Sequence, residues 1–144
     1  MKQLIILLGL VLTLLRAETE FADPPPAIDN PRQIVFQITS DKDEEIHHVL
    51  SSANNIMKFY GPEKVQIAIV AYYHGIRALL KSEKDIRVRV EALMTYDVEF
   101  IACGNTMQTK KIAREQILDD AEVVTAGIVE IAERIKKGWI YIRP

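Results

Sequence analysis

The chain has 144 residues, of which 49% are hydrophobic and 26% charged, and its formal net charge is −2. This length is enough for about one domain with a sizeable core, and the composition is that of a folded globular protein. A mildly acidic chain lacks the basic surface that binding to phosphate backbones requires. We therefore expect no nucleic-acid partner.

Residues 1–17 have the pattern of a secretory signal peptide. Lys2 gives a positive start, residues 4–15 are an uncharged apolar run, and a polar shift follows at Glu18. The run is shorter than the roughly 20 residues of a transmembrane helix, so we expect no stable membrane span in the mature form. The pattern predicts a periplasmic or secreted protein, with an uncleaved anchor as the alternative.

Residues 18–32 are rich in proline, with Asp23-Pro24-Pro25-Pro26 and Asn30-Pro31, and show no hydrophobic periodicity. This composition predicts an extended tether between the leader and the folded part. We find no internal repeat and no sign of a second domain beyond it. The sequence thus predicts one domain over residues 33–144.

Strand and helix patterns alternate along this domain. The strands are expected at residues 34–39, 64–73, 97–103, 121–125 and 139–142. The helices are expected between Ser40 and Gly61, from Ser82 to Met94, from Asn105 or Thr106 to about Gln116, and from Ile128 to Gly138. The segment from Ser40 to Glu44 offers an N-cap with a carboxylate three residues on, which suggests a capping box for the first helix. Most of the strands lack polar alternation, as parallel strands covered on both faces do. The expected fold is a flavodoxin-like, three-layer α/β/α domain with a mostly parallel five-stranded sheet.

Ligands of such sheets bind at the carboxyl ends of the strands. A candidate catalytic cysteine, Cys103, is expected at this edge, after the third strand. The candidate binding residues that the strand ends bring to the same edge are His74, Gly75, Arg77, Gly104, Asn105 and Thr125. Together they suggest a small site built around a thiol.

Cys103 is the only cysteine of the chain. At a strand end next to a helix N-terminus, the unpaired N–H groups and the helix dipole favour a thiolate. The alternative is a small buried residue that ends the strand, because free cysteines are often buried and burial makes a thiol inert. An unpaired cysteine in an exported protein favours a reactive thiol. The residues leave both interpretations open.

Three segments in this order resemble the DsrE/DsrF-like family of sulfur-relay proteins. They are the strand that ends in His74-Gly75, the segment from Phe100 to Thr106, and Val123 to Ile128 leading to Gly138-Trp139-Ile140-Tyr141-Ile142. The resemblance spans residues 33–144. It implies a three-layer α/β fold, assembly into a homo-oligomer such as a trimer, and a cysteine that carries sulfur as a persulfide. Cys103 resembles that family cysteine.

Two functions follow as hypotheses. The first is a sulfur-handling protein in which Cys103 carries sulfane sulfur outside the cytoplasm, supplied or accepted by a thiol or sulfur-donor protein. In this hypothesis Arg77, Lys110 and Lys111 could attract an anionic sulfur species, or they could be an ordinary solvated surface. The second is a non-catalytic oligomeric module for assembly or small-molecule binding, in which the cysteine is structural.

Other patterns argue against further chemistry. His47 and His48 are adjacent, whereas two metal ligands on one helix face would be about four residues apart. We therefore expect no metal site. The chain contains no Walker loop, no Gly-x-Gly-x-x-Gly and no Gly-x-Ser-x-Gly motif. No cofactor is expected.

Overall fold

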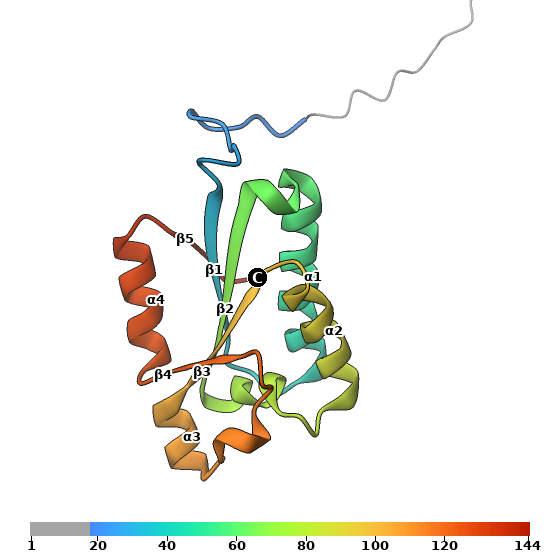
Figure 1. The fold of residues 1–144 in the computed structure, drawn as a ribbon, viewed down its shortest axis with the longest axis vertical. Helices are drawn as coiled ribbons and strands as arrows, with labels where there is room; N and C mark the ends of the chain where they lie inside the picture. The colour runs from blue at the N-terminus through green and yellow to red at the C-terminus, as the bar shows by residue number, and fades with distance from the viewer. Residues whose placement is uncertain (1–17) are drawn as a thin grey trace, which may run out of the picture.

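The structure is a computed structural model that describes residues 18–144 (Figure 1). The expected leader, residues 1–17, lies outside the described residues. The main elements are β1 (Arg32–Ile38), α1 (Asp43–Tyr60), β2 (Val65–Ala71), α2 (Lys84–Met94), β3 (Glu99–Cys103), α3 (Gly104–Lys110), β4 (Glu122–Val124), α4 (Gly127–Lys136) and β5 (Ile140–Ile142). Short 3₁₀ helices occur at Pro62–Lys64, Tyr73–Leu79 and Arg114–Gln116.

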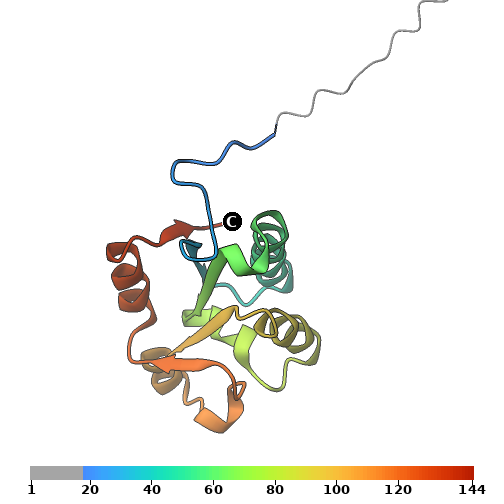
Figure 2. The same cartoon turned by 45° about the horizontal axis from the view of Figure 1, so that its top comes forward.

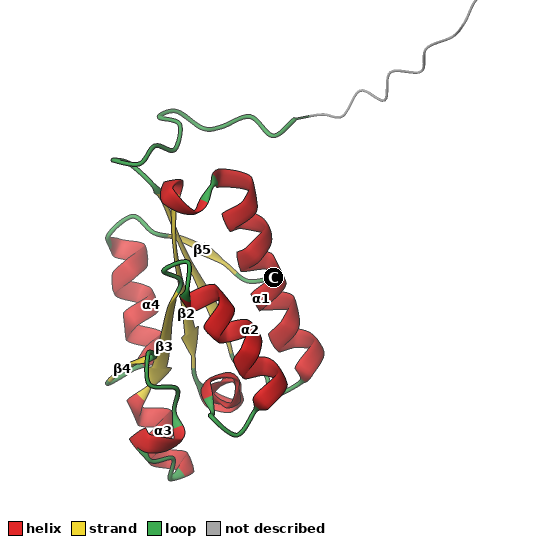
Figure 3. Cartoon of the chain, turned by 45° about the vertical axis from the view of Figure 1, so that its right-hand side comes forward, coloured by secondary structure: helices red, strands yellow, loops and turns green. Residues whose placement is uncertain are grey.

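The five strands form one parallel sheet in the order β4-β3-β2-β1-β5. Strands β1 to β4 lie side by side in chain order. Helix α4 then carries the chain back across the sheet, and β5 pairs with the free edge of β1. Helices α1 and α2 therefore cover one face of the sheet and α4 covers the other, while α3 lies at the carboxyl end of β3 (Figures 1 and 3). The expected three-layer α/β/α fold with a parallel five-stranded sheet is confirmed.

The two faces of the sheet are covered unequally. The larger core lies under α1 and α2 and includes Phe36, Leu50 and Phe100. The smaller core joins four strand residues to Ile131 of α4; the strand residues are Val35, Ala68, Val70 and Ile101. Because strands in the middle of the sheet bury side chains on both faces, β2 is almost continuously apolar, as the sequence predicted.

The chain before β1 follows the domain surface. Phe21 packs against Phe59 and Tyr60 at the end of α1, and Arg32 Nη2 donates a hydrogen bond to Ala22 O at 2.6 Å. This segment enters at the amino ends of the strands, far from α3 (Figure 2). Within residues 18–144, no helix is long and apolar enough to cross a bilayer.

The predicted start signals of two helices are wrong. Lys42 occupies the cap position of α1 without a side-chain hydrogen bond, and Ser40 Oγ instead accepts a bond from Lys42 N–H at 3.2 Å. The capping box expected within residues 40–44 therefore does not form. Helix α2 begins at Lys84, and Glu83 rather than Ser82 precedes it.

The third helix begins earlier than predicted, with Cys103 rather than Asn105 or Thr106 at its cap position, and it ends earlier as well. Helix α3 ends at Lys110, because Lys111 takes the left-handed conformation with φ 56°. Ile112 N–H then donates to Met107 O at 2.9 Å, and Lys111 N–H donates to Gln108 O at 3.2 Å. This is the bonding of a Schellman motif. A glycine usually marks that motif in a sequence, and a lysine here gives no such signal.

Candidate functional site

Cys103 is the last residue of β3 and the N-cap of α3, with an extended backbone at φ −82° and ψ 114°. Because Cys103 is the N-cap residue, its sulfur replaces the side-chain oxygen that usually caps a helix. No side-chain oxygen caps α3. Only 6% of the residue is exposed. The thiol is therefore close to the surface but largely enclosed.

A second helix also begins at this cysteine. Gly127 is the first residue of α4, and a Cβ built on it would lie 3.1 Å from Cys103 Cβ and 3.0 Å from Val70 Cγ1. Those distances are tighter than ordinary contacts between side chains. The absence of a side chain thus allows the start of α4 to approach the cysteine closely.

Backbone hydrogen bonding holds the two helix starts together. Asn105 N–H donates to Thr125 O at 3.0 Å, which joins the turn after β3 to the turn after β4. A Cβ on Gly104 would lie only 3.0 Å from Val124 O, so this position also favours a residue without a side chain. The positive ends of α3 and α4 consequently converge on one sulfur atom.

These surroundings shift the ionisation of the thiol. Burial of Cys103 is the largest single influence and raises its pKa. Hydrogen-bond donors oppose burial; in order of effect they are Gly127 N–H, the hydroxyl and N–H of Thr106 and, least, the Asn105 N–H that also donates to Thr125 O. Their combined effect is larger, so the pKa of the thiol lies below its ordinary value and the thiolate is favoured.

Tyr73 connects the end of β2 to this centre. Its N–H donates to Thr106 Oγ1 at 3.0 Å, and its backbone is left-handed with φ 55°. Its ring packs against the His74 ring at a centroid distance of 3.9 Å. Lys110 Nζ lies 3.3 Å from His74 Nδ1 and 5.8 Å from the centre of the Tyr73 ring. His74 is thus held on the rim by neighbours that contact the helix of Cys103.

Tyr72 lies on the other side of the Gly127 position, where an added Cβ would be 3.5 Å from Tyr72 Cβ. Its hydroxyl donates to Gln37 Oε1 at 2.8 Å. Burial raises the pKa of this phenol, and the nearby Tyr141 and Cys103 raise it further. Tyr72 therefore stays protonated at neutral pH and serves as a half-buried wall of the site.

The candidate residues do not all contribute in the same way. Gly104, Asn105 and Thr125 lie in the two joined turns beside Cys103, where their backbone groups make the contacts described above. His74 lies on the rim, one residue beyond Tyr73. Of the candidate binding residues, Gly104, Asn105, Thr125 and His74 therefore lie close to Cys103.

Gly75 and Arg77 serve other contacts. A Cβ on Gly75 would lie 2.0 Å from Ile38 O, so this glycine allows two backbone segments to pack together. Arg77 binds Asp43 Oδ1 at 2.6 Å and Glu83 Oε2 at 2.7 Å, at the starts of α1 and α2. Hydrogen bonding to Glu83 and Asp43 raises the pKa of the guanidinium. Arg77 thus joins two helices in the described structure.

The sequence did not place Thr106, Gly127 or Tyr73 among the candidate site residues. Thr106 stands three residues after the N-cap, the spacing at which a side chain can reach back to a cap residue. The glycine at the first position of α4 was a second signal, because a residue without a side chain permits a close approach. The left-handed backbone of Tyr73 left no trace in its residue type, because this conformation normally favours glycine or asparagine.

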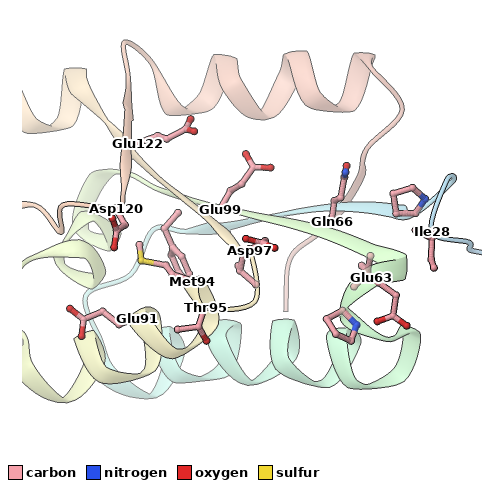
Figure 4. A pocket seen from close by; sticks show the side chains of 15 residues that line it. Ile28, Glu63, Gln66, Glu91, Met94, Thr95, Asp97, Glu99, Asp120 and Glu122 are labelled. Carbon is pink, nitrogen blue, oxygen red and sulfur yellow. The ribbon is translucent and has the colours of Figure 1, made fainter.

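A large groove lies at the other edge of the sheet. A groove of about 870 Å³ opens at the amino ends of the strands, and its acidic side chains include Glu91, Asp97, Asp120 and Glu122 (Figure 4). Cys103 is at the opposite edge. Among residues 18–144, no three His, Cys, Asp or Glu side chains are placed to hold a metal ion.

The fold and site define a small parallel α/β protein with one thiol at the carboxyl edge of its sheet, between two helix N-termini. Residues 32–144 match the DsrE/DsrF-like family. The chain belongs to the DsrE/DsrF-like family, and the resemblance seen in the sequence is confirmed. A comparison with curated protein sequences finds no match.

Solved structures share this fold. MTH1491 from Methanobacterium thermoautotrophicum, a protein of unknown function, is 30% identical with a TM-score of 0.74, over 78% of this chain and 99% of that one. The ychN protein from E. coli is 15% identical with a TM-score of 0.67, over 79% and 99% of the two chains. BT1422 from Bacteroides thetaiotaomicron is 15% identical with a TM-score of 0.58, over 78% and 94%. The last two show similarity of fold alone.

Proposed function

We propose that this protein is a sulfur carrier that holds sulfane sulfur as a persulfide on Cys103. The observation that carries the proposal is the convergence of two helix N-termini on a single enclosed thiol. A thiolate is the nucleophilic form of cysteine, and hydrogen-bond donors around the sulfur favour that form. Membership of the DsrE/DsrF-like family supports a sulfur-relay role.

The chemical step needs no external oxidant if the donor already contains sulfane sulfur. The Cys103 thiolate attacks the terminal sulfur of an inorganic polysulfide dianion and forms a new S–S bond. The terminal S–S bond of the polysulfide breaks, and its electron pair leaves with a polysulfide one sulfur shorter. The product is a cysteine persulfide anion, and delivery to a thiolate acceptor is the same kind of exchange in the other direction.

Intact mass spectrometry of the native protein after incubation with tetrasulfide tests this proposal. We expect the wild-type chain to gain the mass of one sulfur atom and to lose it on treatment with dithiothreitol. The Cys103→Ser variant should remain unmodified, and serine at an N-cap is compatible with the helix. An unmodified wild-type chain would leave Cys103 as a structural residue and refute the carrier.

A second feature favours the assembly module, which is compatible with a carrier. Within residues 18–144, α4 is the only helix on its face of the sheet, and this side exposes several large apolar residues (Figure 3). They are Ile128, Val129 and Ile135 of α4, and Tyr141 of β5, which pairs with Val35 on this face. Exposed apolar side chains gathered on one face are typical of protein–protein contacts. We propose that this α4 face is buried in a homo-oligomer, such as the trimer that family resemblance suggests.

The compartment is also a proposal. The sequence pattern of residues 1–17 supports export and cleavage near Glu18. Cys103 is the only cysteine of the chain, so in an oxidising compartment it has no partner for an internal disulfide. N-terminal sequencing of protein recovered from periplasmic and cytoplasmic fractions tests this. Full-length chain found only in the cytoplasmic fraction would contradict it.

A further inference from the structure

We infer that Tyr73, His74 and Lys110 form a rim that selects small anionic sulfur species as the donors to Cys103. The inference rests on the proposed carrier role and names the substrate class for the same site. It depends on how these three side chains contact one another, on their connection to Cys103, and on the distribution of charge over the molecule.

The three side chains form one cluster. The Lys110 ammonium has only donors, so His74 Nδ1, 3.3 Å away, accepts its hydrogen bond. In the tautomer that accepts this bond, the imidazole carries its hydrogen on Nε2, which provides a second donor. Lys110 also lies 5.8 Å from the centre of the Tyr73 ring, and that ring packs on His74. The cluster therefore presents the positive charge of Lys110 and an N–H donor of His74 beside the Tyr73 ring.

The cluster is attached directly to the helix that begins at Cys103. Thr106 and Lys110 are four residues apart on α3 and therefore lie on the same side of the helix. Both contact Tyr73, Thr106 through the Tyr73 N–H at 3.0 Å and Lys110 through the ring. The charge of Lys110 is thus held about one helical turn beyond the residue that faces the sulfur.

Charge is distributed unevenly between the two edges of the sheet. The groove at the amino ends is lined by acidic side chains, whereas α3 contains none. At the carboxyl edge, acidic residues lie at the start of α1, where Asp43 is paired with Arg77 and Glu45 with Lys42, and in the first turn of α4, where Glu130 is paired with Arg134. The field of this acidic protein therefore favours the approach of an anion at the α3 edge and opposes it at the other.

Access favours a small donor. Cys103 is only 6% exposed, so a sulfur atom carried on a folded partner can reach it only over a small exposed area. An inorganic polysulfide or thiosulfate is much smaller than a folded partner and carries the negative charge that Lys110 attracts. Tyr73, which is 59% exposed, leaves the rim open to solvent.

Paired alkylation rates test the selectivity without any sulfur chemistry. Iodoacetate is an anion and iodoacetamide is neutral, and both react with the same thiolate. The ratio of their second-order rate constants at one pH therefore reports the local field and is independent of the thiolate fraction. We would measure this ratio at low and high ionic strength for the wild type, Lys110→Gln and Lys58→Gln.

Lys58→Gln is the matched control, because it removes the same charge from an exposed position in the last turn of α1, at the opposite edge. We expect Lys110→Gln to lower the iodoacetate to iodoacetamide ratio about two- to fourfold at low ionic strength, and salt should erase most of the difference. Lys58→Gln should leave the ratio unchanged. Equal ratios for the wild type and Lys110→Gln, or an equal fall in Lys58→Gln, would overturn the inference.

Loading by tetrasulfide completes the test. If Cys103 carries sulfur and the rim selects its donor, Lys110→Gln should slow loading by about the same factor as it lowers the alkylation ratio. Loading that is unaffected by Lys110→Gln would overturn the inference while leaving the carrier intact. A changed alkylation ratio in a protein that never loads sulfur would refute the carrier alone.

Discussion

Tyr73 and Thr106 are joined by a hydrogen bond in which the backbone N–H of Tyr73 donates to Thr106 Oγ1 at 3.0 Å. The bond links the end of β2 to the first turn of α3, across the edge where Cys103 lies. Since the hydroxyl oxygen already accepts a hydrogen, its own hydrogen is free to point elsewhere, and the Thr106 hydroxyl contributes to lowering the pKa of Cys103. Thr106 is thus a positioning residue for the thiolate.

Thr106→Val should remove this donor while keeping the shape of the side chain. A hydrogen bond to a charged group contributes about 1.5–3 kcal/mol, and solvent near the rim reduces it, so we expect alkylation by iodoacetamide at neutral pH to slow about three- to tenfold. The midpoint of the rate against pH should move upward. Thr106→Ser, which retains the hydroxyl, should behave like the wild type.

Thr109→Val is the control on the same helix. Thr109 Oγ1 donates to Asn105 O at 2.9 Å, so its hydroxyl serves the helix backbone. A pH profile that shifts equally in Thr109→Val and Thr106→Val would show a general loosening of α3. The assignment of Thr106 fails in that case.

Gly75→Ala should destabilise the fold strongly. The new methyl group would lie 2.0 Å from Ile38 O and 2.2 Å from Ile38 C, and neither backbone atom can move without displacing the end of β1. We expect a loss of about 3 kcal/mol or more in the free energy of unfolding, measured by urea denaturation.

Gly138→Ala separates packing from backbone strain. Gly138 has φ 98° and no atom within 4 Å of a built Cβ, so alanine there meets only the cost of the left-handed backbone. That cost is about 1–2 kcal/mol. If Gly75→Ala cost no more than Gly138→Ala, the close approach of Gly75 to β1 would not exist in solution.

The architecture could be predicted from the sequence because the strands are buried on both faces. Residues such as Ile69 and Val70 pack on opposite sides of the sheet, so a continuous apolar run identifies a central parallel strand. The position of Cys103 at a strand end and a helix start followed from the same pattern. These features depend only on neighbours along the chain.

The rest of the site depends on contacts between distant segments. The approach of Gly127 to Cys103 requires α4 to begin beside β3, and the bond from Tyr73 to Thr106 requires a left-handed residue after β2. Arg77 was predicted to be a site residue, and contacts between distant segments determine its position as well. Its position after β2 suggested a site residue, but Asp43 and Glu83 from two other segments hold its guanidinium.

Val129→Glu tests whether the α4 face is an interface. Val129 is 53% exposed on α4, and a carboxylate there would be buried without a partner if a second copy covers this face. We expect light scattering to report an oligomer for the wild type and a monomer for Val129→Glu. Val88→Glu, at a 64% exposed valine of α2 on the other layer, should keep the oligomer. A monomeric wild type, or dissociation by both substitutions, would contradict an interface at the α4 face.

The stability of the protein should depend on pH through Cys103. Burial raises the pKa of the thiol, but the donors from Gly127, Thr106 and Asn105 lower it below its ordinary value overall. A group that loses its proton more easily in the folded state stabilises the fold once it is charged. This contribution is complete above the pKa of the unfolded thiol, about 8.5, and is lost as the pH falls through the lower folded pKa.

Comparison with Cys103→Ser isolates this contribution. Other titrating groups on the elements around the sulfur, which are Tyr72, His74 and Lys110, are present in both proteins and cancel in the difference. The free energy of unfolding of the wild type, measured by urea denaturation under reducing conditions, should rise relative to Cys103→Ser as the pH increases from about 6 to about 9, and then level off. A difference that stays constant would mean that the folded and unfolded thiols titrate alike. A difference that falls with rising pH would mean that burial outweighs the donors, and the thiol at the junction of α3 and α4 would then be inert.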